Sequence, residues 1–305
     1  MQYKEWLEMW LENYVTPMRK VRTADLYTEI AEKKINPYLG GCDLDELTPI
    51  IIQRYVTELS QSGNVRTGKG LSSNSVNGVI SVIQNSLQTA YRLGYTKGYI
   101  GDKIIRPKTT EKRIECFTAA EQRKIEQAAL ESKALKIRGV VICLYTGLRI
   151  GELLALTWSD VNFTEREISV SKSCYHGKRG RITYGTKTAN SVRAIPLSKP
   201  LIKILREMKS GSESEYVVSS NGKPVETRTY QKNFESLLKK LQIGHRGFHA
   251  LRHTFATRAL ECGMDVKTLS EVMGHKNSSV TLNRYAHCLS EHKKAMMNRL
   301  GKNLE

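Results

Sequence analysis

The sequence predicts a mainly α-helical protein with a small antiparallel β-sheet: an all-α N-terminal domain followed by an α+β domain. Apolar residues recur at helical spacing along most of the 305 residues, and one stretch, residues 167–196, is instead rich in β-branched residues and Gly-containing turns. The chain also exceeds the usual size of one hydrophobic core, which favours two domains.

Residues 1 to about 100 read as four or five amphipathic helices. The clearest cover residues 3–15, 24–38, 49–59 and 73–93. The third has Thr48 as its cap and Pro49 in its first turn, and Ser72 or Ser73 can cap the fourth. We therefore expect one helical domain over residues 1–105.

A charged stretch that contains Pro107 and lacks a sustained apolar period follows, so we place a linker at residues 106–116. Thr118 and Glu121 then form the capping-box pattern that opens a helix. The second domain is expected to cover residues 117–305.

This second domain combines helices with a small sheet. Helices are predicted at residues 118–131, 134–146, 149–156, 200–208, 227–241, 249–262, 266–273, 279–284 and 291–300. The segments ISVSKS, RITYG and VRAIPL, between Glu167 and Pro196, predict a small antiparallel sheet inserted between these helices.

The composition indicates a polyanionic partner. The formal net charge is +18, the pI is about 9.6, and residues 111–305 carry 34 Lys+Arg against 19 Asp+Glu. Such an excess is typical of proteins that bind nucleic acid, although plain solubility is an alternative explanation.

No feature indicates secretion or a membrane. The six cysteines never lie closer than 26 residues apart, so there is no CxxC pair, and they read as reduced thiols. Glutamates interrupt the apolar N-terminus, and no apolar run approaches the roughly 20 residues of a spanning helix. We expect a cytoplasmic protein with no membrane partner.

A set of side chains suited to phosphate chemistry lies near the C-terminus. It comprises His249, Arg252, His253, His275 and Tyr285. An arginine presents a planar fork of donors to phosphate oxygens, imidazoles donate hydrogen bonds or move protons, and a phenol can attack phosphorus. Because no carboxylate at metal-ligand spacing accompanies them, the set predicts covalent phosphoryl transfer without a metal or other cofactor.

Two simpler interpretations compete with this one. His249 and His253 lie at i and i+4, which suits zinc, but zinc hydrolases with that spacing read HExxH, and Ala250 stands where their glutamate would be. A tyrosine such as Tyr285 is ordinarily a packed aromatic, and it becomes a useful nucleophile only among cationic neighbours.

Two other cations of this domain are candidates for the same site. Arg149, in TGLRIGEL, begins a helix, where its charge adds to free backbone N–H groups; the alternative is a surface arginine paired with Glu152. Lys187, in YGTKTANSVRAIPL, lies between two predicted strands, where a lysine can protonate an alkoxide leaving group. Lys172 and Lys178 compete locally for that role.

In order and spacing, these pieces resemble the tyrosine recombinases of the phage integrase family. The matching segments are TGLRIGEL, TKTANSVRAIPL, HALRH, MGH and the final Tyr285. One departure is Met273, where the family usually has leucine before Gly-His. The resemblance covers residues 1–300 and implies an N-terminal SAM-like core-binding domain and a catalytic domain that clamp duplex DNA.

The resemblance also implies the chemistry. Tyr285 would attack the scissile phosphate and leave a 3′-phosphotyrosyl bond with a free 5′-hydroxyl. Arg149 and Arg252 would hold the non-bridging oxygens, and His275 would donate a further hydrogen bond.

Three more roles follow from the same resemblance. His249 would accept the proton of the tyrosine, Lys187 would protonate the leaving 5′-oxygen, and Glu152 would support the site from behind. No metal, ATP or other cofactor takes part.

We therefore expect a site-specific DNA recombinase, most simply the integrase of a mobile element or prophage in a bacterial cytoplasm. By resemblance it would act as a tetramer on two DNA sites, through a Holliday junction, with an accessory excision factor as a further partner. The alternatives are a Xer-like resolvase or invertase, a type IB-like topoisomerase, and a DNA-binding regulator that does not cut.

Two features at the ends of the chain leave alternatives open. The predicted helices begin within the first few residues, so an additional N-terminal domain that binds arm sites is either absent or truncated. The last predicted helix places Met296, Met297 and Leu300 on one side. This side would either dock on a neighbouring subunit or fold back on its own domain.

Overall fold

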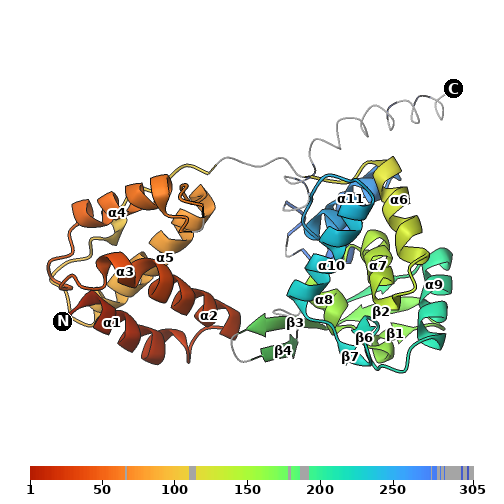
Figure 1. Cartoon of the computed structure of the whole chain (residues 1–305), viewed down its shortest axis with the longest axis horizontal. Helices are drawn as coiled ribbons and strands as arrows, with labels where there is room; N and C mark the ends of the chain where they lie inside the picture. Colours follow the sequence, from red (N-terminus) through yellow and green to blue (C-terminus); the bar gives the residue numbers. More distant parts are fainter. Residues whose placement is uncertain are drawn as a thin grey trace. The chain divides into compact units, whose positions relative to one another are not determined.

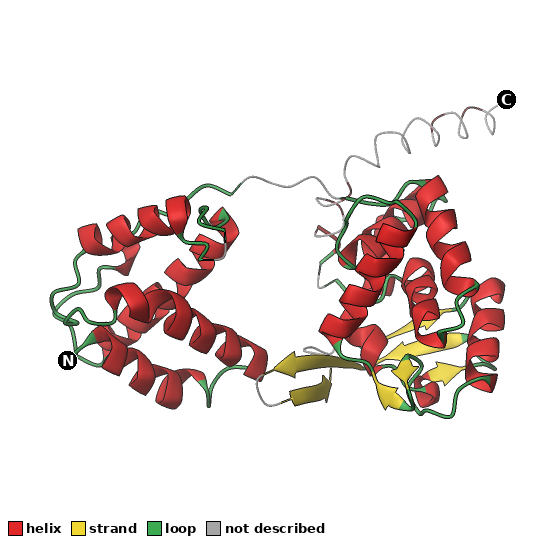
Figure 2. Ribbon diagram, in the orientation of Figure 1, coloured by secondary structure: helices red, strands yellow, loops and turns green. Residues whose placement is uncertain are grey.

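The computed structural model divides into two compact units, Met1–Lys112 and Arg113–Glu305. It describes residues 1–65, 67–109, 115–177, 180–185, 192–275, 277–279, 282, 285, 297 and 301. The elements are labelled in Figure 1, and Figure 2 shows helices in the first unit and helices with strands in the second. The predicted class, mainly α with a small antiparallel β component, is confirmed.

The first unit is helical throughout its regular structure. Its elements are α1 (Tyr3–Trp10), η1 (Leu11–Val15), α2 (Val21–Ile30), η2 (Ala31–Ile35), α3 (Asn36–Leu39), α4 (Pro49–Ser62), α5 (Ser73–Arg92) and η3 (Gly101–Lys103). The π-helical turns η1 and η2 continue α1 and α2 without a break. The predicted caps are confirmed, because the Thr48 and Ser72 hydroxyls each accept the backbone N–H three residues further on.

Helix α1 lies against α5 through aromatic side chains. Trp6 and Trp10 are buried, and the Trp10 indole Nε1 donates to the Thr89 hydroxyl at 3.1 Å. The Tyr3 hydroxyl lies 2.7 Å from the Ser86 hydroxyl. The polar tips of Tyr3 and Trp10 therefore each have a partner on α5, whereas the buried Trp6 Nε1 has no hydrogen-bond partner among the described residues.

The chain that leaves α5 stays attached to the first unit beyond η3. The Gln53 side chain accepts from the Ile105 amide and donates to its carbonyl. Arg106 donates to the Gln84 side chain at 2.6 Å and to the Asn77 carbonyl at 3.1 Å. Residues 110–114 lie outside the described residues, and the predicted limits of 1–105, 106–116 and 117–305 stay a prediction.

The second unit combines the remaining helices with short strands. Its helical elements are α6 (Ala119–Leu130), η4 (Leu135–Arg138), α7 (Gly139–Thr146), α8 (Ile150–Ala155), η5 (Trp158–Asp160), α9 (Lys199–Ser210), α10 (Thr227–Lys240), α11 (His249–Glu261) and α12 (Val266–Met273). The Thr118–Glu121 capping box of α6 is confirmed. The segment predicted as a helix from residue 134 instead begins with the 3₁₀ turn η4, and α7 starts only at Gly139. In this turn the Lys136 carbonyl accepts a hydrogen bond from the Tyr230 hydroxyl at 2.8 Å.

The predicted sheet divides into separate antiparallel ribbons (Figure 2). The strands are β1 (Val161–Asn162), β2 (Glu167–Val170), β3 (Lys172–Gly177), β4 (Gly180–Gly185), β5 (Arg193–Pro196), β6 (Ser219–Ser220) and β7 (Lys223–Pro224). One sheet has the order β1-β2-β5, while β3 pairs with β4 and β6 with β7. The sequence does not predict β1, β6 and β7, because two-residue strands have no measurable alternation.

Helix α7 forms the centre of the second unit and positions the start of α8. Every residue of α7 except Tyr145 is buried, and α11, α6 and α8 pack around it. The helix ends at Gly147, whose φ of +65° is left-handed. A Cβ at Gly147 would lie 2.5 Å from the Phe255 ring of α11, so this sharp turn into Arg149 requires glycine.

Several predictions fall outside the described residues. They are the loop that carries Lys187, its competitor Lys178, most of the helices predicted at 279–284 and 291–300, and the docking of Met296 and Leu300. Among the described helices, none is both long and apolar enough to cross a membrane.

Candidate active site

The start of α8 presents Arg149 together with a buried carboxylate. Arg149 is the N-cap residue, and its guanidinium Nη1 donates to Glu152 Oε1 at 2.7 Å while its backbone N–H donates to Oε2 at 3.0 Å. The pairing at i+3 is therefore real, but it is not a surface pair, since the Glu152 side chain is only 4% exposed. Arg149 itself stays 40% exposed. The carboxylate fixes an arginine whose outer side faces solvent.

Glu152 is held charged by a second arginine that sequence reasoning did not assign. Arg193 of β5 donates from Nη2 to Glu152 Oε2 at 2.8 Å. Burial alone would raise the pKa of the Glu152 carboxyl, but the hydrogen bond and charge of Arg193, with the charge and amide of Arg149, outweigh it and lower the pKa to about 2. This carboxylate remains ionised at every pH where the protein would work.

Arg252 is buried in the middle of the cluster. It lies on α11, is 2% exposed, and donates to the Gly147 carbonyl at 2.6 Å and the Met273 carbonyl at 2.7 Å. Burial first, and then the neighbouring charge of Arg149, lower the pKa of Arg252 to about 9, which leaves it cationic at neutral pH. Its fork is thus oriented by backbone groups rather than by a mobile side chain.

His275 lies beside Arg252 because α12 ends just before it. Gly274 is the left-handed C-cap of α12, with φ +64°, and turns the chain so that His275 Nε2 is 2.8 Å from Arg252 Nη2. A guanidinium only donates, so Nε2 is the acceptor, and a neutral His275 carries its proton on Nδ1. Arg149 Nη2 donates to the Gly274 carbonyl at 3.2 Å, which brings both arginines to the same turn.

Tyr285 contacts His253 of α11, a histidine that belongs to the set selected from the sequence but to which the family resemblance gave no role. Its side chain is completely buried, and its hydroxyl is 2.7 Å from His253 Nδ1. The exposed His249, one turn earlier on α11, meets His253 edge to face with ring centroids 4.7 Å apart. The i, i+4 spacing that suggested zinc therefore places both imidazoles near the phenol.

The structure brings most of the predicted residues together. Arg149, Glu152, Arg252 and His275 form one hydrogen-bonded network around the end of α12. The Tyr285 hydroxyl contacts His253 of α11, and His249 lies one turn before His253 on that helix. Lys187 lies outside the described residues. Its competitor Lys172 is engaged elsewhere, because its ammonium lies 2.9 Å from Asp160 Oδ2 and donates to the Thr157 hydroxyl at 2.8 Å.

This arrangement defines a class of chemistry. Two guanidinium groups and an imidazole can hold the oxygens of a phosphodiester, and a phenol adjoins them with histidines that can take its proton. Among the described residues, no group of three or more histidine, cysteine or carboxylate side chains is arranged to hold a metal ion. These arginine, histidine and tyrosine side chains together can support transfer of a phosphoryl group to a phenol.

Known protein families match both units of the chain. The chain matches the phage integrase family over residues 108–292 and the phage integrase N-terminal SAM-like domain over residues 2–60. A tyrosine recombinase XerC-like protein of Caldanaerobacter subterraneus subsp. tengcongensis is 31% identical, with 94% of this chain and 79% of that protein covered. The ICEBs1 integrase of Bacillus subtilis is 25% identical, with 89% and 75% covered.

A solved structure has the same fold. The Tn1549 transposon integrase, in complex with a circular intermediate DNA, matches with a TM-score of 0.82 at 23% identity over 98% of this chain and 99% of its own. The chain belongs to the phage integrase family, and it is a tyrosine-type site-specific DNA recombinase.

Proposed function

We propose that this recombinase is the integrase of a mobile DNA element or prophage, which cleaves and rejoins specific duplex sites through Tyr285. The observation that carries the proposal is the convergence of Arg149, Arg252 and His275 on the C-terminal turn of α12, with the Tyr285 hydroxyl nearby against His253 of α11. Fixed cations of this kind stabilise the charge that develops on an attacked phosphate, where loss of one donor typically costs about 100-fold to 1,000-fold in rate.

The proposed reaction conserves the energy of the DNA backbone. The Tyr285 oxygen forms a bond to the scissile phosphorus while the bond from phosphorus to the 5′-oxygen breaks, leaving a 3′-phosphotyrosyl link and a 5′-hydroxyl. His249 takes the phenol proton, and Lys187 returns a proton to the departing oxygen. Attack by a 5′-hydroxyl of the partner strand reverses these steps, so neither ATP nor a metal is consumed.

Tyr285 must become accessible before it reacts. The side chain is completely buried, and a phosphate of a separate DNA molecule cannot reach a buried hydroxyl. We assign the contact with His253 to the DNA-free protein. We assign the proton transfer to His249 once the phenol turns outward, because His249 is exposed and lies beside His253 on α11.

We further propose how the protein assembles. Four protomers bind two double-stranded DNA sites and exchange strands through a Holliday junction, as the resemblance to tyrosine recombinases implies. An accessory excision factor would set the direction of the reaction, and the protein would work on DNA in a bacterial cytoplasm. The excess of basic residues in the second unit supports duplex DNA as the partner.

A Xer-like resolvase is the second candidate. The observation that favours it is the 31% identity to a protein described as XerC-like, which exceeds the 25% identity to the ICEBs1 integrase. The two candidates share every chemical step and differ in their DNA. A resolvase recombines two copies of one chromosomal site, whereas an integrase joins an element to a different target.

One experiment separates these functions. The unmodified protein and its Tyr285→Phe and Tyr230→Phe variants are each incubated with DNA duplexes in the presence of EDTA. The duplexes carry the candidate junctions between the element that encodes this chain and the flanking genome. Tyr230 is a matched control, since it is another buried tyrosine, and its hydroxyl donates a hydrogen bond to the Lys136 carbonyl, away from the site. We expect covalent complexes on denaturing gels for the unmodified protein and Tyr230→Phe and none for Tyr285→Phe, together with recombinant product.

Other outcomes would contradict the integrase assignment. Product from two copies of a single chromosomal site indicates a resolvase, and relaxation of any supercoiled plasmid without product indicates a topoisomerase. Binding without any covalent complex indicates a regulator. An adduct formed by Tyr285→Phe would remove Tyr285 as the nucleophile.

A further inference from the structure

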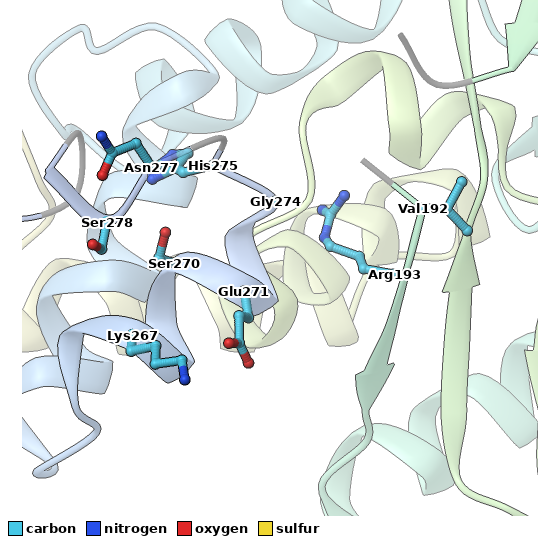
Figure 3. A pocket seen from close by; sticks show the side chains of 9 residues that line it. All are labelled: Val192, Arg193, Lys267, Ser270, Glu271, Gly274, His275, Asn277 and Ser278. Atoms are coloured by element: carbon cyan, nitrogen blue, oxygen red, sulfur yellow. The ribbon is translucent and has the colours of Figure 1, made fainter. Parts of the chain in front are cut away.

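Arg193 has no role in the reaction described above, yet it lies in the same cluster. It opens β5, opposite Val170 of β2, and its side chain is only 6% exposed. Arg193 lines a cavity of about 380 Å³ together with Gly274 and His275. Figure 3 shows the side chains that line it. Since so little of its side chain is exposed, its contacts within the protein define what it does.

The first contact is a fork on the Glu152 carboxylate. Arg193 Nη2 lies 2.8 Å from Glu152 Oε2 and Nη1 lies 3.4 Å from Oε1, while Arg149 binds the same two oxygens through its Nη1 and its backbone N–H. Glu152 is therefore clamped from two sides. The position of the exposed Arg149 depends on a carboxylate whose other partner is the buried Arg193.

The second contact is with the end of α12. Three consecutive carbonyls there each accept one arginine: Val272 from Arg193 at 2.6 Å, Met273 from Arg252 at 2.7 Å, and Gly274 from Arg149 at 3.2 Å. The C-terminal end of a helix carries partial negative charge, which favours such an array of cations. Two of these arginines are the proposed phosphate ligands, and the third is Arg193.

The third contact is with the turn that carries His275. A Cβ placed on Gly274 would lie 2.9 Å from Arg193 Nη1 and 3.2 Å from its Cδ and Cζ. The guanidinium therefore packs directly against the backbone of Gly274. Any shift of Arg193 alters the turn from which His275 reaches Arg252.

We propose that Arg193 is a positioning residue for strand transfer, which orients Arg149 through Glu152 and His275 through the end of α12. The inference rests on the proposed phosphotyrosyl reaction. Lysine cannot replace arginine in this role, because one ammonium lacks the planar fork that binds the carboxylate while Nε binds Val272. Displacement of catalytic groups by about 1 Å can cost about 100-fold in rate.

Arg193→Lys tests the role, with Arg138→Lys as its matched control. Arg138 also binds one carboxylate, Glu207 at 3.4 Å, and one carbonyl, that of Leu130 at 3.1 Å, but outside the cluster. The probe is a nicked junction duplex that traps the covalent complex. At saturating DNA we expect Arg193→Lys to form the complex about 10-fold to 100-fold more slowly, and Arg138→Lys at the unmodified rate.

Two further readouts separate positioning from a general loss of structure. In the Tyr285→Phe background, Arg193→Lys should change the Kd for the duplex by less than about two-fold, since the side chain is buried. The double variant Arg193→Gln with Glu152→Gln removes both buried charges together, which preserves folding better than removal of one. We expect it to react about ten-fold more slowly than Glu152→Gln alone, because Arg193→Gln also removes the contacts of Arg193 with Val272 and Gly274 at the end of α12.

The outcomes are distinguishable from those of the proposed function. If the unmodified protein forms no complex that depends on Tyr285, the proposed function and this inference are both wrong. If it forms one and Arg193→Lys forms it equally fast, only this inference is wrong. A double variant that reacts as fast as Glu152→Gln alone would also overturn it, because Arg193 would then not act through the end of α12.

Discussion

At the scale of single residues, the site is organised around a buried carboxylate that must remain charged. Glu152 receives both Arg149 and Arg193 and has its pKa lowered to about 2. A carboxyl whose pKa is lower in the folded chain stabilises the fold above its unfolded pKa, and this contribution is lost as the pH falls through the folded value. Glu152 therefore makes the stability of the second unit fall at acidic pH.

The first prediction concerns that link. The shift of the Glu152 pKa from 4.5 to about 2 corresponds to about 3 kcal/mol of unfolding free energy that is present at neutral pH and disappears between about pH 5 and pH 2. Glu152→Gln should be less stable at neutral pH and should lose less stability on acidification. Urea unfolding, read by hydrogen exchange on peptides of the second unit, measures both.

Glu207→Gln is the control for this prediction, because Glu207 pairs with Arg138 on the surface and is 51% exposed. It should leave the acid dependence unchanged. Equal acid sensitivity in Glu152→Gln and the unmodified protein would contradict the assignment of a strongly lowered pKa to Glu152.

The second prediction decides which histidine takes the tyrosine proton. His249→Gln should slow formation of the covalent complex about 100-fold, within the usual range for loss of a general base. His253→Gln should slow it by only a few-fold, because His253 holds the buried hydroxyl in the DNA-free protein. Single-turnover rates at saturating DNA measure both. The reverse ranking would make His253 the base.

Sequence reasoning identified the chemistry of the site but not all of its members. Arg149, Arg252, His275 and Tyr285 were recognisable because their residue types and order follow a family pattern. Arg193 was not, because its role depends on Glu152, a partner 41 residues away. His253 was in the candidate set, but its contact with Tyr285, 32 residues away, is defined only by the folded chain.

At the scale of elements, the left-handed C-cap of α12 determines where the catalytic side chains meet. Local signals predicted the helices well, since a cap such as Thr118 or Ser72 acts within three residues. The division of the strands into β1-β2-β5 and β3-β4 was not predictable, because pairing of β2 with β5 joins residues across an intervening hairpin.

The third prediction compares two glycines that both end helices with positive φ. Gly274→Ala and Gly263→Ala should each cost about 1 kcal/mol of stability, the usual penalty of the left-handed conformation. Only Gly274→Ala should also slow covalent complex formation, by about ten-fold or more, since its Cβ would press on Arg193 while that of Gly263 meets open space. Thermal melts and adduct rates measure the two effects. Equal rates in the two variants would contradict the role of the α12 turn.

At the scale of the whole molecule, the net charge of +18 lies mostly in residues 111–305. This positive charge attracts the phosphates of DNA and so contributes to the binding affinity. Exposed charges are screened by salt, whereas the buried Arg252 and the clamped Glu152 are screened much less. Binding and chemistry should therefore respond differently to ionic strength.

The fourth prediction follows from that difference. For Tyr285→Phe, the logarithm of the DNA association constant should fall linearly with the logarithm of the salt concentration, with a slope of about −0.9 for each phosphate neutralised. The adduct rate of the unmodified protein at saturating DNA should change little over the same range. A flat binding curve would contradict a binding mode dominated by phosphate contacts.

The most direct test of the central claim is the chemical identity of the covalent complex. The adduct, formed with EDTA and without ATP, is digested with trypsin and a nuclease and mapped by tandem mass spectrometry. The account predicts a nucleotide joined through its 3′-phosphate to the phenolic oxygen of Tyr285 and to no other residue. A 5′-phosphate link, or attachment to another residue such as His275 or Tyr230, would contradict it.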